Sequence, residues 1–201
     1  MLKIIGSVTS PFTRVVRVAC EELALPYAFD ITAPFGKMTP GQSAMLTKHN
    51  PLMKVPVLVD GSAIIPDSRS ILRHLFKQHG GGFGAGMEDT PEAESALTVI
   101  YGVMDAGILR FMLGKSHPEI RADAGYMARL VERLREGLGW LEKQPQLGQA
   151  FGVHEALLIC GLEWFEKRGI YPWREFAGLV KLHAAHAERP SLVKTRIPET
   201  A

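Results

Sequence analysis

The segment of residues 50–75 constrains the fold more than any other part of this chain, because a proline stands at the start of a short β-branched run. The run covers residues 55–59 and ends at an Asp-Gly turn signal, and a second short strand follows at 64–65. Asp67 then opens a helix whose apolar residues recur at helical spacing. The segment therefore predicts a ββα unit.

The proline limits how the first strand of this unit is used. Because Pro56 has no N–H for a sheet ladder, it should begin an edge strand or a special bend. Its neighbour Val55 then keeps a backbone N–H and a C=O for an extended partner. At the start of the helix, Asp67 and Ser68 have the side chains of an N-cap, and we expect them to cap whatever else they do.

Ahead of this unit, the chain alternates strand and helix patterns, as an α/β domain does. We expect strands at 2–6 and 27–31, a helix at about 11–23 and a short helix at about 42–48. In the first helix, the apolar face holds Phe12, Val15, Val16, Ala19 and Leu23, and the face pointing away holds Arg14, Arg17, Glu21 and Glu22.

A glycine-rich stretch at 80–89 predicts a domain boundary, because only long helical patterns follow it. We expect helices at about 91–113, 118–141 and 153–168, and a fourth from Pro172 to a point before Pro190. The third is apolar almost all round, as expected for a helix at the centre of a bundle.

The composition argues against several classes of protein. A net charge of +2, with Lys and Arg spread along 201 residues, lacks the footprint of a nucleic-acid-binding protein. No signal-peptide core and no long uncharged apolar run is evident, so we expect no membrane partner and a cytoplasmic location. Cys20 and Cys160 lie in apolar helical patterns, which favours buried reduced thiols. His183 and His186 have no further ligands nearby in sequence, so no metal site is predicted.

Together these motifs resemble the glutathione S-transferase family in its bacterial, serine-type form. Residues 50–75 are similar to the family's glutathione-binding core, in which a cis-proline follows a valine and an acid-Ser pair opens the third helix. Further matches are the first strand at 2–6, the active-site turn at 9–13, a fourth-helix run at 104–107 and a near-terminal element at 189–191. The resemblance implies a thioredoxin-like α/β domain at 1–79, a Gly-rich linker at 80–89, an all-helical substrate-binding domain at 90–201, and a homodimer.

Ser10 is the catalytic residue that this resemblance implies. The residues alone predict an N-cap whose hydroxyl accepts a hydrogen bond from the Thr13 N–H. In the family, the same turn faces the sulfur of glutathione, and Phe12 belongs to it. A donated hydrogen bond and a helix N-terminus both lower a thiol pKa from about 8.5 towards neutrality. Ser7 and Thr9 are close enough in sequence to compete for this role.

The resemblance also implies which residues bind glutathione, the co-substrate. Val55 and Pro56 hold its cysteinyl backbone through strand-like hydrogen bonds. Ser68 and the helix N-terminus bind the γ-glutamyl carboxylate, and the Asp67 carboxylate pairs with the ammonium.

The glycyl carboxylate of glutathione requires a cation. Lys54 is the first choice, and His49 or Lys37 are alternatives. The chain departs from the family at Met53, where glycine is common, and at Gly152, where the third bundle helix often has a capping hydroxyl.

Tyr101, Met104 and Phe111 are expected to line an apolar pocket for the second substrate, with Arg110 at its rim. A plain core stripe is the alternative interpretation of the same spacing. Asp105 stands among these apolar residues, so we expect a buried carboxylate with a partner.

The leading hypothesis is a glutathione transferase that directs the thiolate of glutathione at a small electrophile, apolar or aromatic. A glutathione-dependent isomerase or dehalogenase, and a non-catalytic binding or regulatory protein of the same fold, are the alternatives. A cysteine-dependent enzyme is disfavoured because Cys20 lies well inside the first helix, away from the turn.

Overall fold

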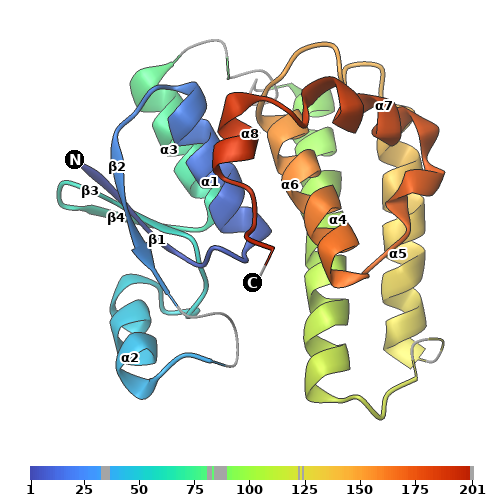
Figure 1. Cartoon of the computed structure of the whole chain (residues 1–201), viewed down its shortest axis with the longest axis horizontal. Helices are drawn as coiled ribbons and strands as arrows, with labels where there is room; N and C mark the ends of the chain where they lie inside the picture. The colour runs from blue at the N-terminus through green and yellow to red at the C-terminus, as the bar shows by residue number, and fades with distance from the viewer. Residues whose placement is uncertain (33–36, 81–82, 84–89, 122, 124, 200–201) are drawn as a thin grey trace. The chain divides into compact units, whose positions relative to one another are not determined.

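The computed structural model describes residues 1–32, 37–80, 83, 90–121, 123 and 125–199. The chain forms two compact units (Figure 1). Unit 1 comprises Met1–Gly84 together with Glu188–Ala201, and unit 2 comprises Ala85–Ala187. Most of the linker predicted at 80–89 lies outside the described residues.

Unit 1 is built on a four-stranded sheet in the order β2-β1-β3-β4. The strands are β1 (Leu2–Gly6), β2 (Tyr27–Ile31), β3 (Val57–Asp60) and β4 (Ala63–Pro66). β1 is parallel to β2 and antiparallel to β3, and β3 is antiparallel to β4. β3 begins directly after Pro56, as expected for a residue that lacks a ladder donor.

Helices cover both faces of this sheet. α1 (Pro11–Glu22) and α3 (Ser68–His79) lie side by side on one face (Figure 1). On the other face, Leu46 of α2 (Pro40–His49) packs with Ile5 and Val57. The alternation of side chains along a strand explains how one sheet contributes to two apolar layers.

α2 begins earlier than the sequence predicts because a capping box precedes it. Thr39 Oγ1 accepts a hydrogen bond from the Gln42 N–H at 3.3 Å, and Gln42 Oε1 accepts one from the Thr39 N–H at 3.0 Å. This reciprocal pair satisfies two donors of the helix N-terminus.

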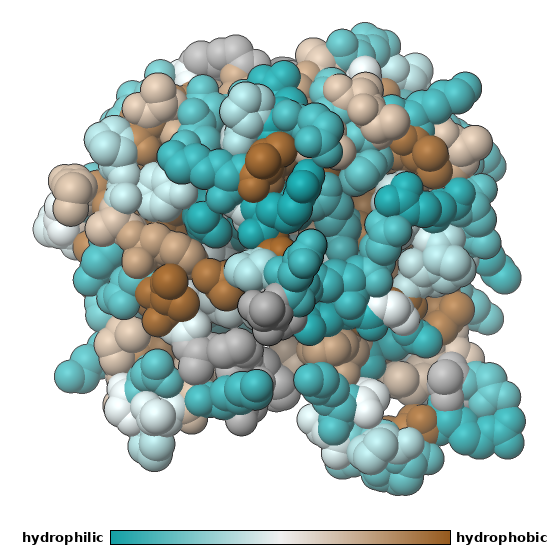
Figure 2. All heavy atoms as spheres, viewed as in Figure 1, coloured by the Kyte–Doolittle hydropathy of each residue, from teal (hydrophilic) through white to brown (hydrophobic). Residues whose placement is uncertain are grey.

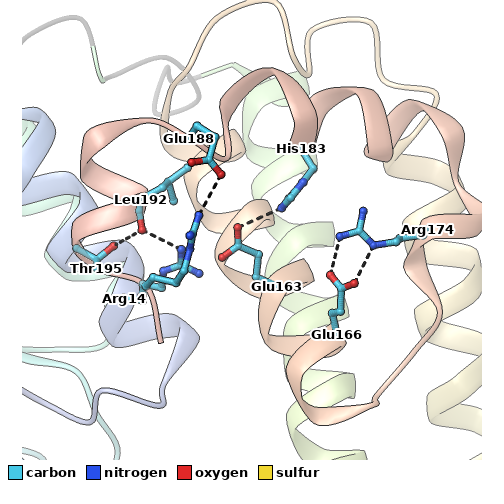
Figure 3. A network of polar contacts seen from close by, with 9 residues as sticks. Arg14, Glu163, Glu166, Arg174, His183, Glu188, Leu192 and Thr195 are labelled. Atoms are coloured by element: carbon cyan, nitrogen blue, oxygen red, sulfur yellow. Dashed lines mark hydrogen bonds and ion pairs between the residues drawn. The ribbon is translucent and has the colours of Figure 1, made fainter. Parts of the chain in front are cut away.

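Arg14 corrects the predicted orientation of α1. It is only 2% exposed, and its Nη2 donates a 3.1 Å hydrogen bond to the carbonyl oxygen of Leu192 in α8 (Pro190–Lys194; Figure 3). The side of α1 assigned to solvent is therefore covered by the end of the chain.

The same contacts connect the end of the chain to unit 1. Residues 188–201, predicted as part of the helical domain 90–201, group with unit 1 by their contacts. Arg189 pairs with Glu22 at 2.8 Å, and Lys194 pairs with Glu21 at 2.8 Å. Charges on α1 therefore hold this terminal segment, and no local sequence pattern shows where such partners lie.

Unit 2 is all-helical. Its elements are α4 (Pro91–Ser116), α5 (Gly125–Leu141), α6 (Val153–Arg168), the 3-10 helix η2 (Trp173–Glu175) and α7 (Ala177–His186). α6 is buried almost all round, as predicted. At its start, the Glu155 carboxylate accepts the N–H groups of Gly148 and Gly152, each at 3.0 Å. One acid thus caps this helix without a capping hydroxyl.

Two helices of unit 2 differ from the prediction. α5 begins at Gly125 rather than near residue 118, in a region where Arg121 and Asp123 pair locally at 2.6 Å. The predicted fourth helix is divided into η2 and α7. Glu142 Oε1 accepts the Gly178 N–H at 2.7 Å, so a residue distant in sequence caps the second piece.

α4 is apolar and long enough to cross a membrane, judged by length and composition. Core helices of soluble proteins pass the same test. In unit 2, the buried residues of α4 pack against α5 and α6. The face of the molecule in Figure 2 is largely hydrophilic, with hydrophobic residues in small separate groups. These observations favour a core helix.

Candidate active site

The sheet register brings three loops of unit 1 to one end of the sheet. Ile5, near the end of β1, is paired with Val57 at the start of β3, and Val57 is also paired with Pro66 at the end of β4. The turn after β1, the Val55-Pro56 step and the start of α3 therefore lie at the same end. The N-termini of α1 and α3 follow these loops, and both carry positive potential.

Ser10 is the N-cap of α1. Its Oγ accepts a hydrogen bond from the Thr13 N–H at 3.2 Å, as the sequence predicts. A hydroxyl that accepts such a bond retains its own proton for donation. By contrast, the Ser7 and Thr9 hydroxyls lie 2.9 Å apart and engage each other. Of the three competing hydroxyls, Ser10 has the geometry best suited to a further acceptor.

Gly6 and Thr13 position this turn, and neither role was predicted from the sequence. A Cβ placed on Gly6 would lie 2.3 Å from Thr13 Cγ2, so only glycine fits where β1 meets α1. Thr13 is fully buried. A glycine at the end of a predicted strand was the available signal, because such a residue often marks a close approach of backbone to another element.

The Val55–Pro56 peptide bond is cis, as the resemblance implied. The carbonyl oxygen of Pro56 accepts a hydrogen bond from the Asp67 N–H at 3.3 Å. The Val-Pro step and the acid-Ser helix start are therefore joined directly. Val55 itself is half-buried and lies outside β3.

Asp67 has a strained backbone. Its φ of 74° lies in the region that favours glycine, and such a residue costs about 1–3 kcal/mol. The exposed Asp67 carboxylate accepts the Arg69 N–H at 2.8 Å and so caps α3 as predicted. Ser68 is 1% exposed. Strain of this kind concentrates at functional sites, where surrounding contacts maintain it.

Comparison with known proteins agrees with this arrangement. Residues 4–83 match the family described as the glutathione S-transferase N-terminal domain. A glutathione transferase family member from Pseudomonas fluorescens Pf-5, solved with bound glutathione, aligns over 98% of this chain and 100% of its own, with 25% identity and a TM-score of 0.80. Residues 4–83 therefore match the glutathione S-transferase N-terminal domain, and the whole chain has the glutathione S-transferase fold.

Other solved glutathione S-transferases show the same fold along the whole length. The enzyme from Methylobacillus flagellatus KT, with glutathione bound, is 24% identical over 98% of this chain and 100% of its own, with a TM-score of 0.81. The one from Methylobacterium radiotolerans, in complex with glutathione sulfonate, is 23% identical over 98% and 94%, with a TM-score of 0.82. No curated protein sequence matches.

Met53 departs from the family pattern for a reason that the backbone explains. Its φ is 52°, in the left-handed region, and its side chain is 55% exposed. Glycine adopts this conformation without a Cβ penalty, which explains why it is common at this position of the glutathione S-transferase family. In this chain, an exposed methionine stands beside the Lys54-Val55 step instead.

The cations proposed for the glycyl carboxylate have different surroundings. Lys54 directly precedes Val55 and is exposed, while its carbonyl oxygen accepts the Asn50 side-chain N–H at 2.8 Å. His49 Nδ1 lies 2.9 Å from the Met45 carbonyl oxygen in its own helix. Lys37 is exposed, and Phe12 is half-buried in the first turn of α1. Lys54 therefore stays the first choice.

Two of the predicted second-substrate residues, Met104 and Phe111, lie along the contact between α4 and α6. Met104 is 1% exposed, and its Cγ would lie 3.0 Å from a Cβ on Gly161, so it is a core residue rather than a pocket wall. This corrects the expectation for Met104. Tyr101 and Phe111 are half-buried, and the Phe111 ring meets Trp164 edge-on at 5.3 Å.

Two further expectations concern isolated side chains. Asp105 is exposed rather than buried, which is a correction. Both cysteines are buried, as predicted. Burial, with a smaller contribution from the charge of Glu21, raises the pKa of the Cys20 thiol to about 12. The Cys20 thiol therefore stays protonated and unreactive near neutral pH.

Proposed function

We propose that this chain is a glutathione transferase that uses Ser10 to stabilise the thiolate of bound glutathione. The observation that carries the proposal is the Ser10 hydroxyl at the N-terminus of α1. It accepts a hydrogen bond from the Thr13 N–H and retains its own proton to donate. The sheet register supports it, because the same end of the sheet holds the Val55-Pro56 step and the start of α3.

Each part of glutathione has a complementary group at this end of unit 1. The cysteinyl backbone pairs with Val55, just before β3, in the manner of an added strand. The γ-glutamyl carboxylate meets Ser68 and the N-terminus of α3, and its ammonium meets the exposed Asp67 carboxylate. Lys54 is the proposed partner of the glycyl carboxylate. The tripeptide is recognised mainly through its charged ends and its backbone.

The chemistry proposed is a substitution or addition at an electrophilic carbon. The hydrogen bond from Ser10 and the potential of α1 favour the thiolate over the thiol, so a proton leaves glutathione on binding. The sulfur then forms a bond to carbon, and in a substitution a leaving group such as chloride departs with the electron pair. Binding the two reactants together contributes through proximity.

The same site also bears on the alternative functions. A cysteine-dependent enzyme needs a reactive thiolate, whereas the Cys20 thiol is buried with its pKa raised to about 12. A non-catalytic binding protein would not require a hydroxyl such as that of Ser10 to donate a hydrogen bond to the sulfur of glutathione. Glutathione-dependent isomerisation or dehalogenation uses the same thiolate and differs only in the second substrate. We further propose a homodimer that acts in the cytoplasm.

Titration of the pure protein with glutathione by calorimetry tests the proposal when the ultraviolet absorbance of the thiolate is followed in parallel. We expect saturable binding and thiolate formation near neutral pH. S-methylglutathione, which has no thiol proton, is the matched control and should bind without the absorbance change. Binding of both compounds without any thiolate signal would favour the non-catalytic alternative, and binding of neither would overturn the proposal.

A further inference from the structure

Three cations lie near the end of the contact between α4 and α6, and two of them lie over the ring of Phe111. The Lys115 ammonium lies 5.1 Å from the centre of the Phe111 ring, and the Arg168 guanidinium carbon lies 5.7 Å from it. Arg110 precedes Phe111 in α4, and its Nη1 donates to the carbonyl oxygen of Ile170, just past the end of α6. We call Arg110, Lys115 and Arg168 with Phe111 the basic cluster.

The basic cluster is distinguished by its lack of acids. No carboxylate of a described residue forms an ion pair with any of its three cations. Other arginines of unit 2 do have such partners, in the pairs Arg121–Asp123, Arg129–Glu132, Arg135–Glu136 and Arg174–Glu166. The two cations over the Phe111 ring and the nearby Arg110 therefore produce a local positive potential that these residues do not neutralise.

The guanidinium groups of the basic cluster are partly withdrawn from water. The Nε atoms of Arg110 and Arg168 are buried and have no hydrogen-bond partner among the described residues. A charged group that is partly desolvated without an opposite charge is destabilising, and an anion at its outer nitrogens reverses much of that effect. The hydrogen bond to Ile170 limits the movement of Arg110, so its guanidinium is preorganised for such a partner.

We infer that the basic cluster is a binding subsite for the carboxylate of an aromatic acid. The ring of the ligand packs against Phe111, and the carboxylate accepts hydrogen bonds from the arginines, whose planar fork matches it. The inference goes beyond the proposed function and does not depend on it. The anion subsite itself rests only on residues of unit 2.

The first test compares the affinities of the wild type for 4-chloro-3-nitrobenzoate and for its methyl ester by calorimetry. The two rings are similar, but only the acid carries a charge. We expect the wild type to bind the acid about 10-fold more tightly than the ester. Arg168→Leu and Lys115→Leu should each remove most of this preference.

Arg133→Leu is the matched control, because the Arg133 guanidinium carbon lies 5.5 Å from the ring of Tyr126, a cation–ring pair elsewhere in unit 2. This variant should keep the preference for the acid. Equal affinities of the wild type for acid and ester, or an undiminished preference in both test variants, would overturn the inference.

A direct binding measurement separates this inference from the proposed function. Benzoate and the neutral benzamide are titrated calorimetrically into the wild type, Arg168→Leu and Arg133→Leu. We expect benzoate to bind the wild type and the control at least 10-fold more tightly than it binds Arg168→Leu. If glutathione binds but benzoate does not, the subsite is wrong and the proposed function stands. If benzoate binds in this pattern but glutathione does not, the proposed function fails and the anion subsite remains.

Discussion

The guanidinium of Arg14 in the first helix donates a buried hydrogen bond to the carbonyl oxygen of Leu192, 178 residues later in the chain. The contact joins α1, whose N-terminus carries Ser10, to the last helix (Figure 3). Because Arg14 is only 2% exposed, water does not readily replace the lost partner when either group is removed. The end of the chain therefore helps to support the helix on which the proposed chemistry depends.

Arg14→Leu should lower the free energy of unfolding by about 2–3 kcal/mol, since it leaves the buried Leu192 carbonyl oxygen with only the longer, 3.5 Å hydrogen bond from Thr195 Oγ1 among the described donors. Urea unfolding followed by circular dichroism measures the change. Arg17→Leu, on the same helix but only half-buried, is the control and should cost less than about 1 kcal/mol. Equal effects of the two substitutions would show that the buried contact has no special role.

Ser10→Ala should raise the pKa of bound glutathione by about one unit and lower kcat/KM about 10-fold or more, equivalent to about 1.4 kcal/mol. The thiolate absorbance measured against pH reports the pKa. Thr90→Ala is the matched control, because Thr90 caps α4 through a 3.2 Å bond to the Ala93 N–H. It should lose about 1 kcal/mol of stability without altering the thiol. If the thiol pKa is unchanged in Ser10→Ala, Ser10 is only a cap.

Ser68→Ala should weaken glutathione binding by about 1–3 kcal/mol, the usual effect of losing a hydrogen bond to a charged group. Calorimetric titration measures the affinity. Ser70→Ala changes an exposed serine two residues further along the same helix, and it should bind glutathione as the wild type does. An unchanged affinity in Ser68→Ala would assign that residue a structural role alone.

Glu22 should make stability dependent on pH in acid. Burial alone would raise the pKa of Glu22, but the hydrogen bonds from Arg189 and Ser191 and the charge of Arg189 outweigh it, so the pKa lies below its usual 4.5. A lowered pKa in the folded state gives stability that is present above the unfolded value and is lost as pH falls through the folded value. The free energy of unfolding should therefore fall as pH decreases below about 4.5.

Glu22→Gln tests this dependence, because glutamine does not titrate. Unfolding in urea at pH 7 and at several values below pH 4.5 should show a smaller loss in this variant than in the wild type. Glu132→Gln, in an exposed pair with Arg129, is the control and should leave the loss unchanged. The same acid loss in Glu22→Gln as in the wild type would contradict the assignment.

The proposed homodimer predicts a mass of about twice 22.1 kDa by light scattering at micromolar concentration. Exposed apolar side chains of unit 1, among them Leu52, Met53 and Ile64, are available for an interface. A measured mass equal to that of one chain would contradict the dimer.

Local sequence determined much of unit 1 because its signals act over a few residues. A cap joins residues two or three apart, which explains why Ser10 and Asp67 could be assigned to the starts of α1 and α3. A proline without an N–H likewise sets where β3 begins. The combination of these signals led to the family and to the cis Val55–Pro56 bond.

Tertiary structure decided the features that depend on partners distant in the sequence. Periodicity placed Arg14 on an outward face, but only folding brought Leu192 to it, and with it the residues 188–201 into unit 1. Met104 illustrates the opposite case. The helical pattern was consistent with a pocket residue or a core residue, and in the structure α6 covers the Met104 side chain. The basic cluster around Phe111 also combines residues of α4 and α6. A periodic pattern identifies the faces of a helix, whereas the identity of the neighbouring element decides what each face contacts.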